Sequence, residues 1–488
     1  MALSLCMPAL AETWDMSNTE KYPTGEKARI SVNRNEKDPD HPELNGQILT
    51  IWDSGGKDIE QKDEAPVLSG SFESLGLNCY DGTTVHATLQ DAHMEYNADS
   101  RHTLAASGNV ELTLNGSNTV THNNTNKLAI DIDGNGWPRT PGLLTIKGSG
   151  SLTATNTLSS GIRIDNGTLD VTDGTVNVTA ADNGIYALGN TVQVSGGTLC
   201  ATATGEHGIG IKASHNGQVT VSGGKLTASG GSYGIEASEN GRVTVSGGTL
   251  NASAKETVAI TGSSITVNGG VLNLEDNKAP VGILSKDLNV TNGWLTAKGQ
   301  TVSANNITVS GGVMEAGVLN CSQLNVSGGW VEADTLEPRE STIKLSGGNV
   351  KLKSVPDSSF IIHFSKRARL TITEPVSESD VRALVEAFEN AQGVLYTTAY
   401  LRYKPADYTA IPDDVGWDGI YVVYQGTQRD PDSNLATDDN KPLLPSDIVE
   451  IGAAPEGDAG GAIAAVVLGS AAVWGGYEVV TRVILNEL

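Results

Sequence analysis

One motif recurs along the chain, and its clearest copy reads Val219-Thr220-Val221-Ser222-Gly223-Gly224-Lys225-Leu226-Thr227-Ala228. Two apolar residues with a polar residue between them lead into a Gly-centred turn, and the same alternation resumes after it. The last turn residue falls at positions 150, 174, 197, 224, 248, 270, 293, 312, 329 and 348. A recurrence every 17 to 27 residues is typical of a solenoid, whose repeats measure about 20 to 50 residues.

The alternation on both sides of the turn predicts strands with one buried face. After the turns, one inward column contains Leu152, Val176, Leu199, Leu226, Leu250, Leu272, Leu295, Met314, Val331 and Val350. A third strand opens with Gly-Ile in several repeats: Gly161-Ile162, Gly184-Ile185, Gly208-Ile209, Gly234-Ile235 and Gly282-Ile283. Three short strands per repeat, each stacked on its neighbours, predict an all-β, right-handed parallel β-helix, because one repeat cannot bury its inner face alone.

Composition divides the chain into six expected segments. They are a signal-peptide remnant over 1–11, an N-terminal lead or cap over 12–65, the parallel β-helix over 66–355, a small mixed α/β C-terminal cap over 356–425 with a helix at 379–392, a flexible acidic linker over 426–460, and a Gly/Ala-rich hydrophobic helix over 461–488. The first segment ends in Ala9-Leu10-Ala11, which suits a secretory cleavage site, although a short apolar N-terminus is the alternative. The last segment is either a membrane span or the lead into a further domain.

The balance of charge restricts the partners of the chain. Acidic residues exceed basic ones and give a formal net charge of −25. Binding to nucleic acid needs a basic surface, so this class of partner is excluded from the prediction. The acidic exterior leaves calcium as the one cation worth testing, and no other cofactor is expected.

The repeat text supports a resemblance to a known group of proteins. The run from Leu144 to Thr155, followed by Gly161-Ile162 and the Val-Ser-Gly-Gly repeats, resembles β-helical surface proteins of anaerobic gut Firmicutes, many of them labelled carbohydrate-binding-domain-containing proteins. The architecture also resembles that of pectate lyases and polygalacturonases. The tail over 462–485 looks like the stretch that precedes S-layer homology modules in some such proteins. The resemblance implies a secreted bacterial setting and attachment to the cell envelope through 461–488.

An apolar column directly after the turns is the strongest candidate for ligand binding. Its members in neighbouring repeats are Val271, Trp294, Val313 and Trp330. Their chain neighbours belong to the inward column, so these side chains are expected to point outward. Exposed apolar stripes mark ligand or partner sites, and tryptophan rings offer flat platforms for sugars. The alternative is that the C-terminal cap covers this stripe.

Two weaker sites come from acidic residues. Glu315 and Glu332 recur in one outward column, and carboxylates on adjacent strands would lie about 5 Å apart, which is close to the separation in retaining glycosidases. Solvated surface acids are the alternative. Separately, Asp131-Ile132-Asp133-Gly134-Asn135-Gly136 matches half of a calcium loop, with Asp131, Asp133 and Asn135 as the expected ligands. Position twelve is Gly142, so the bidentate glutamate is absent and an ion-free turn is the alternative.

Taken together, these features predict a secreted or cell-surface bacterial β-helix protein with a structural or adhesive role that binds glycans or cell-wall polysaccharide. The alternative is a polysaccharide lyase or glycoside hydrolase of the pectate-lyase-like type. An acidic cluster facing Arg or Lys on one exposed sheet would favour the enzyme. A flat aromatic stripe would favour binding.

Overall fold

The computed structural model describes residues 12–18, 20–22, 27–35, 46–53, 56–80, 82–134, 141–274, 277–354, 361–364, 368–373, 388–389, 394–397 and 421–424. These residues form strands joined by short turns, and no α-helix occurs among them. The predicted all-β class is therefore confirmed for the described part of the chain. The chain divides into two compact units, residues 1–324 with 329–333 and residues 325–328 with 334–488.

The first unit opens with a small group of strands that mixes two kinds of pairing. They are β1 (Thr13–Asp15), β2 (Arg29–Asn35), β3 (Gly46–Asp53), β4 (Gly56–Lys62), β5 (Val67–Phe72) and β6 (Ser74–Cys79). Strand β3 pairs antiparallel with β2 on one side and with β4 on the other. Strand β1 pairs parallel with β5, and β2 pairs parallel with β6. These pairings join the segment expected as a lead or cap to the strands that follow.

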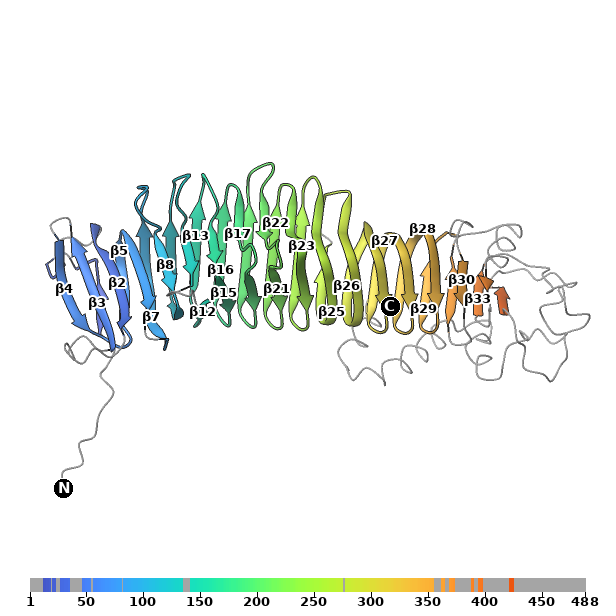
Figure 1. The fold of residues 1–488 in the computed structure, drawn as a ribbon, viewed down its shortest axis with the longest axis horizontal. Helices are drawn as coiled ribbons and strands as arrows, with labels where there is room; N and C mark the ends of the chain where they lie inside the picture. The colour runs from blue at the N-terminus through green and yellow to red at the C-terminus, as the bar shows by residue number, and fades with distance from the viewer. Residues whose placement is uncertain are drawn as a thin grey trace, which may run out of the picture. The chain divides into compact units, whose positions relative to one another are not determined.

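Three parallel ladders organise the rest of the first unit, as Figure 1 shows from blue to yellow. The first ladder, before the turns, contains β9 (Asn109–Asn115), β12 (Gly142–Lys147), β15 (Gly167–Val171), β18 (Thr191–Val194) and β21 (Gln218–Val221). The second ladder, after the turns, contains β7 (Val85–Glu95), β10 (Ser117–Thr121), β13 (Ser151–Asn156), β16 (Thr175–Ala180), β19 (Thr198–Ala203), β22 (Lys225–Gly230) and β24 (Thr249–Ala254). The third contains β8 (Leu104–Ser107), β11 (Ile130–Asp133), β14 (Ile162–Asp165), β17 (Asn183–Tyr186) and β20 (Ile209–Lys212).

Farther along, single long strands replace the short ones. Strand β23 (Tyr233–Val245) takes part in the third and first ladders, and β25 (Val258–Asn273) and β26 (Val281–Val309) extend over all three. Strands β27 (Val313–Val326) and β28 (Trp330–Leu345) follow. The three-ladder repeat therefore persists through these long strands.

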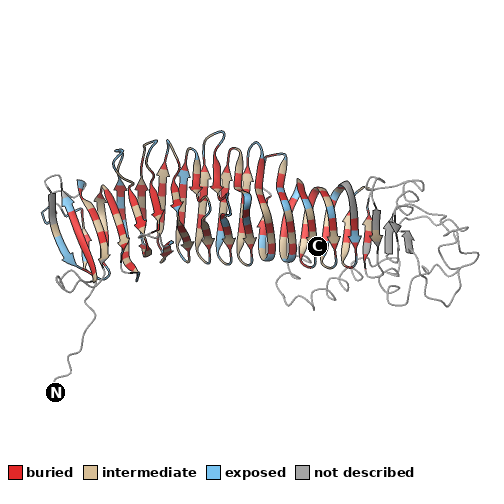
Figure 2. Cartoon of the chain, viewed as in Figure 1, coloured by how far each residue is buried: buried red, intermediate tan, exposed pale blue. Residues whose placement is uncertain are grey.

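The core follows the columns predicted from the alternation. Leu226 and Leu250 are direct partners in the second ladder, and both are fully buried. Their chain neighbours Thr227 and Asn251 are half-buried partners on the opposite face of the sheet. Figure 2 shows this alternation as red and tan bands along the strands. Burying one leucine side chain contributes about 1.5–3 kcal/mol, so the inward columns supply much of the stability.

The register corrects one sequence alignment. The third strand of one repeat was expected to start with Gly208-Ile209 in line with Gly184-Ile185. Strand β20 does begin at Ile209, but the partner of Ile185 and Ile235 is Ile211. The sequence reads Gly208-Ile209-Gly210-Ile211, so two registers that differ by two residues keep the same face inward. Only the stacked structure selects between them.

Parallel pairing continues in the second unit, beyond residue 355 where the repeat was expected to give way to a mixed α/β cap. Its strands include β29 (Asn349–Leu352), β30 (Ile361–Phe364), β31 (Arg369–Ile372), β32 (Phe388–Glu389), β33 (Val394–Thr397) and β34 (Tyr421–Tyr424). They form the parallel series β28–β30–β32 and β29–β31–β33–β34. Phe388 and Glu389 are thus in a strand, and the rest of the helix expected at 379–392 lies outside the described residues, as do 426–460 and 461–488. None of the described residues forms a helix long and apolar enough to cross a membrane.

Candidate functional site

The apolar column after the turns lies on the outer side of the second ladder. Val271 and Trp294 are direct partners on neighbouring strands. One repeat farther, the backbone N–H of Trp330 donates to the carbonyl of Gly312, the residue before Val313, at 2.9 Å. Val271 and Trp330 are each 36% exposed, whereas the alternating residues Leu272, Leu295, Met314 and Val331 are fully buried. We call Val271, Trp294, Val313 and Trp330 the tryptophan surface.

Turn glycines determine where this surface begins on each strand. Each of its four residues directly follows a glycine in the left-handed region: Gly270, Gly293, Gly312 and Gly329, with φ between +64° and +80°. Only glycine adopts this region without a steric cost. The glycines also stack closely, since a Cβ on Gly329 would lie 2.6 Å from the carbonyl oxygen of Gly312. The turns therefore hold the four side chains in line.

Carboxylates anchor the two indole groups by their N–H edges. Trp294 Nε1 donates to Glu315 Oε2 at 3.2 Å, across to the next repeat. Trp330 Nε1 donates to Glu332 Oε2 at 3.4 Å, within its own strand. A ring held at its edge loses little further freedom when a ligand stacks on it, which favours binding.

Glu315 has further partners beside the indole of Trp294. Besides the indole, it accepts a hydrogen bond from Thr296 Oγ1 at 3.4 Å, and its other oxygen pairs with Lys298 Nζ at 3.3 Å. The Glu315 side chain is 14% exposed and that of Lys298 is 65% exposed. These contacts make Glu315 and Glu332 acceptors for the tryptophans, and the catalytic role expected for the pair stays a prediction.

One of the expected calcium ligands, Asp131, has other partners in the structure. Asp131 lies on β11, where its carboxylate accepts two hydrogen bonds from Arg163, Nε to Oδ1 at 2.8 Å and Nη2 to Oδ2 at 3.1 Å. His102 Nε2 lies 3.5 Å from Asp131 Oδ2. A guanidinium therefore already neutralises one of the two proposed carboxylate ligands. Asp133 lies two residues along the same strand, and Asn135 is outside the described residues. Within the described ranges, no group of three His, Cys, Asp or Glu side chains could hold a metal ion.

Burial determines the charge of His102. It lowers the pKa of His102 to about 4, and the negative charge of Asp131 opposes this shift. The Nδ1 atom accepts a hydrogen bond from the Leu128 N–H at 3.0 Å. The neutral ring therefore carries its proton on Nε2, the nitrogen that faces Asp131.

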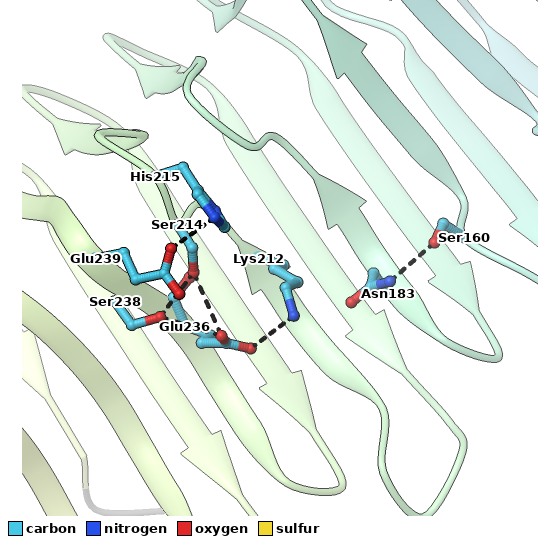
Figure 3. Close-up of polar contacts among 8 residues, drawn as sticks. All are labelled: Ser160, Asn183, Lys212, Ser214, His215, Glu236, Ser238 and Glu239. Atoms are coloured by element: carbon cyan, nitrogen blue, oxygen red, sulfur yellow. Dashed lines mark hydrogen bonds and ion pairs between the residues drawn. The ribbon is translucent and has the colours of Figure 1, made fainter.

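The outer side of the third ladder carries further paired charges. Glu236 Oε2 lies 3.2 Å from Lys212 Nζ, while its Oε1 accepts hydrogen bonds from Ser214 at 3.3 Å and Ser238 at 3.2 Å. Figure 3 shows this group beside the ion pair of His215 with Glu239. Register places Asp131, Arg163, Tyr186, Lys212 and Glu236 in one row. We call this row the ionic face.

Sequence reasoning missed the ionic face because its members are far apart in the chain. Arg163 follows Asp131 by 32 residues. The available signal was the residue after each Gly-Ile pair, which gives Arg163, Tyr186 and Glu236 directly. Lys212 appears only once the register at Ile211 is known. Its charges are mutually compensated, so this face supplies no free base beside an acid.

Comparison with known proteins assigns the chain to a family. A family described as "Carbohydrate-binding domain-containing protein" matches residues 59–358. The match spans more than half of the chain, so the chain belongs to this family. The matched range includes the three ladders and the whole tryptophan surface. No curated protein and no solved structure matches the chain.

Proposed function

We propose that the protein is a secreted or cell-surface bacterial adhesion module that binds a glycan on its tryptophan surface. The observation that best supports this proposal is the pair Trp294 and Trp330. Both lie on one face of the sheet, and each is hydrogen-bonded at the indole edge. Flat apolar rings stack on the C–H faces of sugars. Membership in a carbohydrate-binding family supports a glycan as the partner. Attachment through 461–488 belongs to the same proposal.

We also infer that the three ladders wind as a right-handed parallel β-helix. Each strand pairs parallel with its equivalent in the next repeat, so the connections between paired strands are crossovers. Crossovers of this kind are right-handed in about 98% of cases. Such a helix presents flat outer faces made by strands of one ladder, which suits an extended ligand.

The test of glycan binding compares two tryptophan variants. The full chain is screened on a glycan array, and retention on the best glycan is then measured for Trp294→Ala/Trp330→Ala. We expect retention to fall at least tenfold, with the free energy of unfolding changed by no more than about 1 kcal/mol, because the rings stack on a ligand outside the fold. Trp52→Ala is the matched control, since Trp52 is an exposed tryptophan on β3.

Two outcomes would contradict the proposal. If the double variant binds as the wild type does, the tryptophans are not the platform. If it loses about 3–5 kcal/mol of stability instead, the rings are packed against the protein itself. Surface labelling of intact cells tests the location, and labelling only after lysis would refute it.

A further inference from the structure

The outer side of the second ladder carries a regular grid of small polar side chains. From β10 to β24 the register forms three columns without a shift. The columns are Ser117, Ser151, Thr175, Thr198, Lys225 and Thr249; Thr119, Thr153, Asn177, Cys200, Thr227 and Asn251; and Thr121, Thr155, Thr179, Thr202, Ser229 and Ser253. All are at least partly exposed. We call these residues the hydroxyl face.

The hydroxyl face contains no carboxylate. Fourteen of its 18 residues are Ser or Thr, and Lys225 is the one charged residue. Yet the chain has 57 Asp and Glu residues and a net charge of −25. The neighbouring ionic face, drawn in part in Figure 3, carries acids and bases in the same repeats. The preference of threonine for strands explains the hydroxyls. The acids on this outer side lie beyond the six strands, at Glu95, which pairs with Thr121, and at Glu315 and Glu332 beside the tryptophans.

The hydroxyl face is continuous with the tryptophan surface. Thr249, at the end of its first column, pairs with Val271, and Val271 pairs with Trp294. Both belong to the second ladder, so a ligand on the rings meets the hydroxyls next. Strand spacing makes the hydroxyl face about 24 Å long and about 13 Å wide. One sugar chain is narrower than this grid, so the face has room for more than one chain.

A ligand whose own surface is uncharged, rigid and rich in hydroxyl groups fits the hydroxyl face. Hydroxyl and amide groups both donate and accept hydrogen bonds, so they can pair with sugar hydroxyls across a flat contact. A carboxylate in the same place would lose its hydration without a cation to compensate. We propose that the hydroxyl face and the tryptophan surface together adsorb an insoluble neutral polysaccharide, in which several chains lie side by side. This rests on the proposed function and names its substrate class.

The test measures adsorption of the full chain to microcrystalline cellulose, chitin and granular starch, beside binding to the matching soluble hexasaccharides. The key variant is Thr179→Glu/Thr202→Glu, which places two carboxylates on partner positions of the hydroxyl face. The control is Thr220→Glu/Thr244→Glu, the same change on partner positions of the first ladder. We expect the key variant to weaken adsorption at least tenfold and the control to leave it within twofold. Soluble hexasaccharide binding should be the same in both, since the tryptophans are intact.

The outcomes separate this inference from the proposed function. Binding of soluble hexasaccharides without adsorption to any of the three solids would overturn the inference and leave glycan binding standing. The inference also fails, with glycan binding intact, if adsorption depends on Trp294 and Trp330 but is unchanged in Thr179→Glu/Thr202→Glu. Absence of binding to every soluble and solid probe would contradict both. Thermal unfolding of each variant excludes loss of fold as the cause.

Discussion

Adjacent residues along a strand of the second ladder lie in opposite environments, one buried in the core and the next facing solvent. Leu226 is fully buried against Leu250, whereas Thr227 is half-exposed on the other side of the sheet. A charge at the first position would be desolvated without a partner. At the second position it would remain hydrated. The inward columns therefore tolerate few changes, and the outer columns are free to vary with function.

The first prediction follows from this contrast. Leu226→Asp should lower the free energy of unfolding by at least about 3 kcal/mol, because it combines a lost apolar contact with a buried charge. Thr227→Asp should change it by less than about 1 kcal/mol. Chemical denaturation of both variants measures the difference. Equal losses would show that the register is wrong.

Buried His102 gives the fold a dependence on pH. Its pKa is lowered to about 4 by burial, against an ordinary value near 6.5. Between these values the unfolded chain binds more protons than the folded one, so stability falls as pH decreases from about 6.5 to about 4. We expect the melting temperature to drop across this window, and His102→Gln should drop less steeply. His207→Gln, at an exposed loop position, should retain the wild-type slope. A slope unaffected by His102→Gln would assign the pH effect to other groups.

At the scale of the strand and its turn, the stacked glycines set the geometry. Gly270 has φ +64°, and a Cβ there would lie 2.5 Å from the carbonyl oxygen of Gly248. Gly299 also has positive φ, at +68°, but its Cβ would meet nothing within 4 Å. A Gly→Ala substitution at each site therefore separates the cost of backbone strain, present at both, from the cost of a clash with the neighbouring repeat, present only at Gly270.

Gly299→Ala should destabilise by about 1–2 kcal/mol, the cost of a left-handed conformation for a residue with a Cβ. Gly270→Ala should lose clearly more, because the carbonyl of the neighbouring repeat must also move. Differential scanning calorimetry of both variants measures the gap. A loss at Gly270 no larger than at Gly299 would mean that the turns adapt and do not constrain the stack.

Much of the strand pattern was predictable because it is local. Period-2 alternation and turn glycines mark each strand within about ten residues, which is why the inward columns and the outward Trp294 could be read directly. The remainder depends on contacts between repeats. The run from Gly208 to Ile211 fits two registers, and only its neighbouring strands select one. The pairing of Asp131 with Arg163 likewise follows only from the register between their strands. Strands such as Val394–Thr397 lack a Gly-Gly turn before them, so the sequence carries no local signal that would place them.

For the molecule as a whole, the excess of negative charge opposes folding. A net charge of −25 brings carboxylates together when the chain becomes compact. Salt screens such repulsion, since the Debye length falls from about 30 Å at 0.01 M to about 8 Å at 0.15 M. The charge also favours solubility. It therefore sets conditions for stability without specifying the fold.

The corresponding prediction concerns ionic strength. Raising sodium chloride from 0.01 M to 0.5 M should raise the melting temperature by several degrees, because screening relieves repulsion among the acids. Adsorption to a neutral polysaccharide should change little over the same range. Thermal shift and sedimentation assays with the same samples measure both. A falling melting temperature would indicate that the ion pairs, such as Arg163 with Asp131, outweigh the repulsion.

The in-register ladders have a consequence for how such a protein evolves. Backbone hydrogen bonds fix the spacing of the outer columns at about 4.8 Å per repeat, whatever side chains the columns carry. Duplication of one repeat would lengthen the adsorbing face by one step and preserve its pitch. Point substitutions would then alter the chemistry of a single row, as the change from Thr249 to Val271 to Trp294 illustrates. The length of the outer face and the chemistry of its side chains can thus be selected independently, because the backbone spacing between repeats stays constant.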